Sequence, residues 1–79
     1  MPASLVVHHQ GVVLPRLQYP TIRTAARTAL RFAESGVAIP AIVDDHDELI
    51  WEYPGGDPQA EAAAAALVQL RALAGMKKG

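Results

Sequence analysis

The sequence predicts a small α+β protein with the element order ββαββα. Two observations support this fold class. Short β-branched and apolar runs come in pairs separated by turn residues, first near the N-terminus and again in the middle of the chain. Each pair is followed by a longer segment of helical periodicity that ends at a glycine. The simplest arrangement is a four-stranded antiparallel sheet with the first helix on one face, and with a C-terminal alanine-rich helix that covers the rest or a neighbouring copy.

The first pair of strands is predicted over residues 4–9 and 12–17. Gln10 and Gly11 lie between them, which is the spacing of a tight hairpin with glycine at a position that needs a positive φ. Pro15 has no N–H to donate to a strand ladder. We therefore expect the second strand to have an exposed side at Pro15 or to end early.

The first helix is predicted to begin at Pro20 or Thr21 and to stop at Gly36 as its C′ residue. Its apolar positions recur with helical period and form one face. These positions are Ile22, Ala25, Ala26, Ala29, Leu30 and Ala33. The opposite face is polar and carries arginines spaced four residues apart.

The second pair of strands is predicted over residues 37–43 and 49–53, on either side of the polar tip DDHDE. In the later strand, alternation places Leu49, Trp51 and Tyr53 on the buried face. Glu52 then points into water, and Ile50 is left as a partly exposed aliphatic residue. Aspartates are favoured in the tip because their side chains mimic the hydrogen bonds of a turn.

The last helix is predicted to begin after Asp57 as N-cap, with Pro58 at its first position, and to end at Gly75. Its alanine run has a strong helix propensity without tertiary support. Its apolar stripe consists of Ala63, Leu67, Leu70 and Ala74. Val68 and Leu73 widen this stripe beyond what one sheet face normally covers. The surplus apolar surface favours a twofold dimer through this helix or through a sheet edge.

The 79 residues are predicted to form one domain over 1–79, with 1–3 and 76–79 as tails. The chain is 51% hydrophobic and 19% charged, which excludes intrinsic disorder. A domain of this length buries only about 60% of its unfolded surface, so its core is marginal. The chain has no cysteine, so association is the main remaining way to supplement the core. We expect a cytoplasmic homodimer with no membrane segment.

Arg23, Arg27 and Arg31 form a stripe along the first helix. They lie about 40° apart around the helix axis and span roughly 12 Å along it, so they can meet several anionic groups together. The simplest interpretation is a solvated helix face in which Arg31 pairs with Glu34. An acidic protein partner is the second interpretation. Nucleic acid is the third, and it is disfavoured because the net charge is −1 and no aromatic residue lies among the arginines.

Groups for catalysis or metal binding are scarce. The tip DDHDE lacks the central glycine and the distant glutamate of a calcium loop. His8 and His9 are neighbours in a strand and point to opposite faces, and nothing in the sequence brings either of them to His46. Ser4 and Ser35 do not lie in a nucleophile elbow. We therefore expect no enzymatic activity, no cofactor and no metal.

The sequence thus favours a non-catalytic module that binds a protein partner or itself. The residues assigned to the partner surface are Arg23, Arg27, Arg31, Leu67, Leu70 and Leu73. One alternative is a nucleic-acid-binding protein that uses Arg16 and the arginine face of the first helix. Another is a small phage or mobile-element inhibitor of a larger host complex. The layout, with IVDDHDELIWEY as its second hairpin, is similar to that of many small bacterial proteins, and no motif in it identifies a family.

Overall fold

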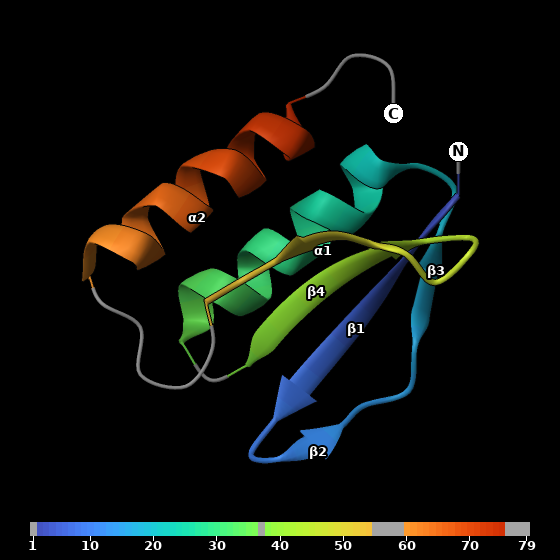
Figure 1. The fold of residues 1–79 in the computed structure, drawn as a ribbon, viewed down its shortest axis with the longest axis horizontal. Helices are drawn as coiled ribbons and strands as arrows, with labels where there is room; N and C mark the ends of the chain where they lie inside the picture. The colour runs from blue at the N-terminus through green and yellow to red at the C-terminus, as the bar shows by residue number, and fades with distance from the viewer. Residues whose placement is uncertain (1, 37, 55–59, 76–79) are drawn as a thin grey trace.

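A computed structural model describes residues 2–36, 38–54 and 60–75 (Figure 1). The chain folds into one antiparallel sheet and two helices, which confirms the predicted α+β class. The elements are β1 (Ala3–His9), β2 (Val12–Val13), β3 (Leu17–Tyr19), α1 (Ile22–Ser35), β4 (Ile39–Asp44), β5 (Leu49–Glu52) and α2 (Ala60–Ala74). Ala3 begins β1 and is buried, so it belongs to the sheet and not to an N-terminal tail.

The sheet is centred on β1 and β4, which pair with each other over six residue positions. On the far side of β1 lie β2 and then β3, and on the far side of β4 lies β5. All pairs are antiparallel. The strand predicted over residues 12–17 ends early, which is one of the two outcomes expected from Pro15: the paired residues of β2 stop at Val13, and a separate strand, β3, begins at Leu17. Pro15 lies in this gap, where it has no N–H for the ladder.

The turn between β1 and β2 has the expected two-residue length. Both of its residues have positive φ angles, 52° at Gln10 and 78° at Gly11. Such angles give a turn whose twist matches that of the flanking strands, and glycine adopts them without strain. The turn sets the register in which His9 lies opposite Val12.

The ends of α1 are those predicted. The side chain of Thr21 accepts a hydrogen bond from the backbone N–H of Thr24, which satisfies one of the free donors of the first turn. At the other end, Gly36 has φ 74° and its N–H donates to the carbonyl of Ala33. The cap assigned to Asp57 and Pro58, and the tail 76–79, lie outside the described residues.

The two helices lie on the same side of the sheet. Helix α1 packs across β1, β3 and β4, and α2 lies beside α1 and packs mainly against it (Figure 1). The side chains that α1 buries are all alanines: Ala25, Ala26, Ala29 and Ala33. Because these side chains are small, the sheet and α2 both approach the helix backbone closely. Leu5, Ile42 and Leu70 are completely buried and fill the centre of the core.

Strand β5 ends at Glu52, one residue before its predicted end, and the exposure of one of its residues differs from the prediction. Trp51 is buried and Glu52 is exposed as expected, but Leu49 is 58% exposed. The cause is a β-bulge. Ile42 of β4 pairs with Trp51, but the next residue of β4, Val43, pairs with Leu49, so Ile50 is skipped. The extra residue shifts the alternation by one position, so Leu49 faces the side opposite to Trp51.

Candidate interaction surface

The sheet has one face that no helix covers. Side chains alternate along β1 and β4, so Leu5 and Ile42 point toward α1, while Val6 and Val43 point to the other side. The register of the strands aligns these outward side chains in three rows, which we call the open face. The rows are Val13, His8 and Ile39; Val6, Ala41 and Glu52; and Gln18, Ser4, Val43 and Leu49.

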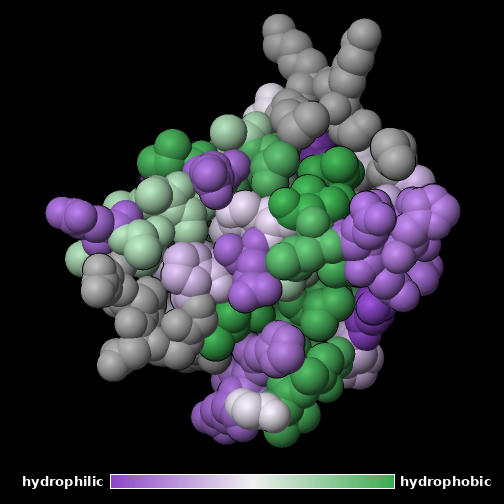
Figure 2. Space-filling model, in the orientation of Figure 1, coloured by the Kyte–Doolittle hydropathy of each residue, from purple (hydrophilic) through white to green (hydrophobic). Residues whose placement is uncertain are grey.

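Most of the open face is aliphatic. Figure 2 has the orientation of Figure 1, in which β5 passes in front of α1. In this view apolar side chains form a band over the sheet, with polar side chains at its flank. Two of the most exposed large apolar residues belong to this face, Val13 at 57% and Leu49 at 58%. They lie on opposite edge strands. The apolar surface therefore extends across the whole width of the sheet.

Sequence analysis missed this surface, although a signal for it was present. In β4, residues 39–43 are apolar at every position instead of at every second one, and β1 contains three consecutive apolar residues, Leu5, Val6 and Val7. Such runs are typical of strands that are buried on both faces. Both helices pack on one side, so the described part of the chain covers only one of the two faces of the sheet.

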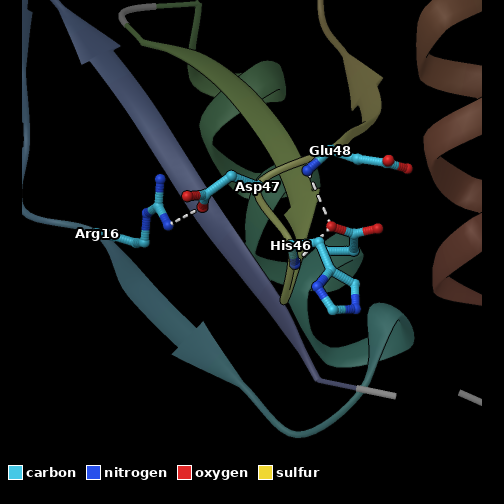
Figure 3. A network of polar contacts seen from close by, with 5 residues as sticks. Arg16, His46, Asp47 and Glu48 are labelled. Atoms are coloured by element: carbon cyan, nitrogen blue, oxygen red, sulfur yellow. Dashed lines mark hydrogen bonds and ion pairs between the residues drawn. The ribbon is translucent and has the colours of Figure 1, made fainter.

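One end of the open face is crossed by an ion pair. Arg16, from the connection between β2 and β3, contacts Asp47 in the turn between β4 and β5. The two side chains meet over β1 (Figure 3). Ser4 and Val43 lie in the row nearest to this contact and are buried, although no helix covers them. Both partners of the ion pair are largely exposed to solvent, so it contributes little to stability.

The turn between β4 and β5 is organised by Asp44. One of its carboxylate oxygens, Oδ1, accepts hydrogen bonds from the backbone N–H groups of His46 (2.8 Å) and Glu48 (2.9 Å) (Figure 3). These bonds favour the ionised carboxylate. The bond from Glu48 is the largest cause of a lowered Asp44 pKa, burial opposes it, and the bond from His46 and the charge of the imidazole add to it.

We expect the carboxyl group of Asp44 to titrate at a lower pH in the folded protein than in the urea-unfolded chain. A carboxyl group with a lowered folded pKa stabilises the fold above its unfolded pKa of about 4, and this contribution is lost as the pH falls through the folded value. The measurement is an NMR titration of the Asp44 carboxyl carbon, with the amide proton of Glu48 as a second reporter. Equal midpoints in the folded and unfolded chain would contradict the expectation.

The histidines do not gather. His8 lies exposed on the open face, His9 points to the opposite side and is half-buried, and His46 lies in the exposed turn with its Nε2 3.8 Å from a carboxylate oxygen of Asp45. Within the described residues, no three histidine, aspartate or glutamate side chains come together as metal ligands.

The arginine face of α1 is only partly as predicted. Arg27 and Arg31 are exposed, but Arg23 is half-buried and its Nε has no hydrogen-bond partner among the described residues. The predicted pairing of Arg31 with Glu34 is wrong, because Glu34 accepts a 3.4 Å contact from Arg71 of α2. The two helices are thus joined by an ion pair, and the arginine stripe lacks the acidic neighbour assigned to it.

The leucines of α2 face inward. Leu70 is completely buried in the core, so it has no surface to offer a partner, and its assignment to a partner surface is not kept. Leu67 and Leu73 are half-buried and pack against the same core. The exposed large apolar residue of this helix is Val68, at 64%. The wide apolar stripe of the sequence is therefore used mainly inside the chain.

The hollows on the described surface include two with different linings. A cavity of about 370 Å³ between β5 and α2 is lined by Ile50, Trp51, Gln69, Ala72 and Leu73. The indole N–H of Trp51 is buried and has no partner among the described residues. A more polar cavity of about 490 Å³ lies at the end of the sheet beside Arg16 and Asp44.

Known proteins provide no guide to this surface. No family model, curated protein or solved structure matches the chain. Within the part of the chain that the structure describes, neither helix has the length and the apolar character needed to cross a bilayer.

Proposed function

We propose that this protein is a non-catalytic binding module that self-associates through the open face, with a second copy as the partner. One observation supports this most directly. Strand β4 is apolar on both faces over residues 39–43, while both helices cover the same face. On the uncovered face, β1 adds Val6 between Ser4 and His8. A second sheet, packed about 10 Å away, would cover the open face.

The charges of the open face fit a second copy. Its rows contain no lysine or arginine, and their single acidic residue is Glu52 on the edge strand. Arg16, which borders the face, is already paired with Asp47. A twofold axis places identical surfaces opposite each other, so a surface of one charge sign would repel its copy. A nucleic-acid partner, in contrast, needs cations that this face does not offer.

The size of the face is sufficient for a weak dimer. The sheet is four strands wide, because β2 and β3 pair with successive parts of the same side of β1. Strands about 4.8 Å apart, with about six residues at 3.3 Å each, give a surface of roughly 19 by 20 Å. Two such surfaces with side-chain relief bury on the order of 1,000 Å², near the lower end of specific interfaces. We therefore expect a dimer that dissociates on dilution.

The composition of the core also supports association. Helix α1 buries only alanines, and α2 buries one alanine and one leucine. Small side chains remove little apolar area from water, and a chain of 79 residues has a marginal core. Dimerisation through the open face increases the apolar area that is removed from water, without a longer chain. The absence of cysteine fits the cytoplasmic location that we propose for the dimer.

The test is the mass of the protein in solution as a function of concentration. Sedimentation between about 10 μM and about 1 mM is expected to show the wild type moving from 8.4 kDa toward twice that mass. Val13→Lys places a charge on the open face and is expected to remain monomeric. Val68→Lys, at a similarly exposed valine on α2, is expected to dimerise like the wild type.

Two outcomes would overturn this function. One is a wild type that stays monomeric at every concentration. The other is a Val13→Lys variant that associates as strongly as the wild type while its circular dichroism is unchanged. Because Val13 is largely exposed, the substitution is not expected to disturb the monomer.

A further inference from the structure

We infer that protonation of His8 switches this self-association off as the pH falls through the range in which an imidazole gains its proton. The inference rests on the function proposed above, because it concerns the same face. It adds that the two copies dissociate at lower pH.

The place of His8 within the open face supports the inference. Its Cα lies opposite Val13 of β2 on one side and opposite Ile39 of β4 on the other. Val6 precedes it by two residues on the same side of β1. His8 is itself exposed, and no ion pair within the described residues involves it. An incoming copy would therefore enclose the imidazole among aliphatic side chains.

No charged group faces His8 from the strands around it. The outward neighbours on β2 and β4 are aliphatic. The nearest acidic residue of the open face is Glu52, which lies on β5 and is separated from β1 by β4. The other charges at the face, Arg16 and Asp47, are paired at its opposite end, beside the row that contains Ser4. Helices α1 and α2 lie behind the sheet.

The sign of the effect follows from these surroundings. A neutral imidazole can be enclosed with modest loss of hydration, but an imidazolium without a counter-charge is expensive to desolvate. Each copy contributes one His8, so an acidic dimer would enclose two like charges. Association is therefore expected to be complete at pH 8 and weakened at pH 5.5, because protonation of histidine side chains occurs between these values. Free carboxyl groups titrate near 4 and stay ionised over this interval.

The three histidines allow a matched experiment. The association constants of the wild type, His8→Gln, His9→Gln and His46→Gln are measured by sedimentation at pH 8 and pH 5.5. His9 points to the other side of the sheet and His46 lies in the turn, so neither belongs to the open face. The wild type and these two controls are expected to lose at least about ten-fold in association at pH 5.5, whereas His8→Gln is expected to lose little.

The possible results separate the two proposals. A wild type that dimerises equally at both pH values overturns the role of His8 and leaves the dimer intact. A His8→Gln variant that keeps the full pH dependence also overturns it. A wild type that is monomeric at both pH values overturns the proposed function together with the switch.

Discussion

Replacing Leu70 by alanine is expected to lower the free energy of unfolding by about 2–5 kcal/mol. Leu70 is completely buried, and the only other side chain that α2 buries is Ala66. Leu70 is therefore the main apolar side chain that holds α2 against α1 and the sheet. Its truncation removes buried methyl groups and leaves a cavity between elements that cannot close fully, because α1 already approaches through small alanines.

Thermal and urea unfolding followed by circular dichroism measures this loss, and hydrogen exchange shows where it occurs. The amides of α2 are expected to lose protection first in Leu70→Ala, because that helix depends most on the lost contact. The matched control is Val68→Ala on the same helix, where the valine is 64% exposed and the change is expected to stay within about 0.5 kcal/mol. Equal stabilities of the two variants would show that α2 is not anchored through Leu70.

Replacing Ala29 by leucine is expected to destabilise the protein by about 1–3 kcal/mol or more. Ala29 is completely buried in the core on α1, the helix that packs against both the sheet and α2. Because Ala29 is 0% exposed, we expect a larger side chain there to push α1 away from one of its neighbours. This result is opposite to that expected from helix propensity and hydrophobicity alone, since alanine and leucine are both good helix formers and leucine is more apolar.

Arg27→Leu is the control for Ala29→Leu, because it places the same new side chain on the same helix at an exposed position. Its effect on the urea midpoint is expected to be small. An Ala29→Leu variant that is as stable as the wild type would mean that α1 does not lie as close to its neighbours as the buried alanines indicate. An unchanged Arg27→Leu beside a destabilised Ala29→Leu would locate the constraint in the packed face of the helix.

The elements that sequence patterns predicted well are those whose signals are local. Thr21 and Gly36 set the ends of α1 because a cap needs only a hydroxyl acceptor or a residue that tolerates positive φ. Gln10 and Gly11 formed the expected turn for the same reason. Asp44 organised its turn through bonds to backbone groups two and four residues away.

The errors concern relations between distant segments. Leu49 was expected to be buried, but a bulge against β4 moved it to the open face, and the alternation within β5 alone contains no sign of that bulge. Glu34 was assigned to Arg31 on its own helix but pairs with Arg71, 37 residues later. Leu70 was assigned to a partner surface because its stripe is apolar, and periodicity does not say which apolar stripe the chain itself covers.

Local patterns were sufficient to predict the fold class, both ends of α1 and the turn at Gln10 and Gly11, because these features follow from side-chain chemistry and backbone preferences over a few residues. The placement of both helices on one side of the sheet could not be predicted in this way. It leaves Val6, His8, Val13 and Ile39 together on the uncovered side. Strand register and helix placement depend on contacts between residues far apart in the chain, which local patterns do not encode.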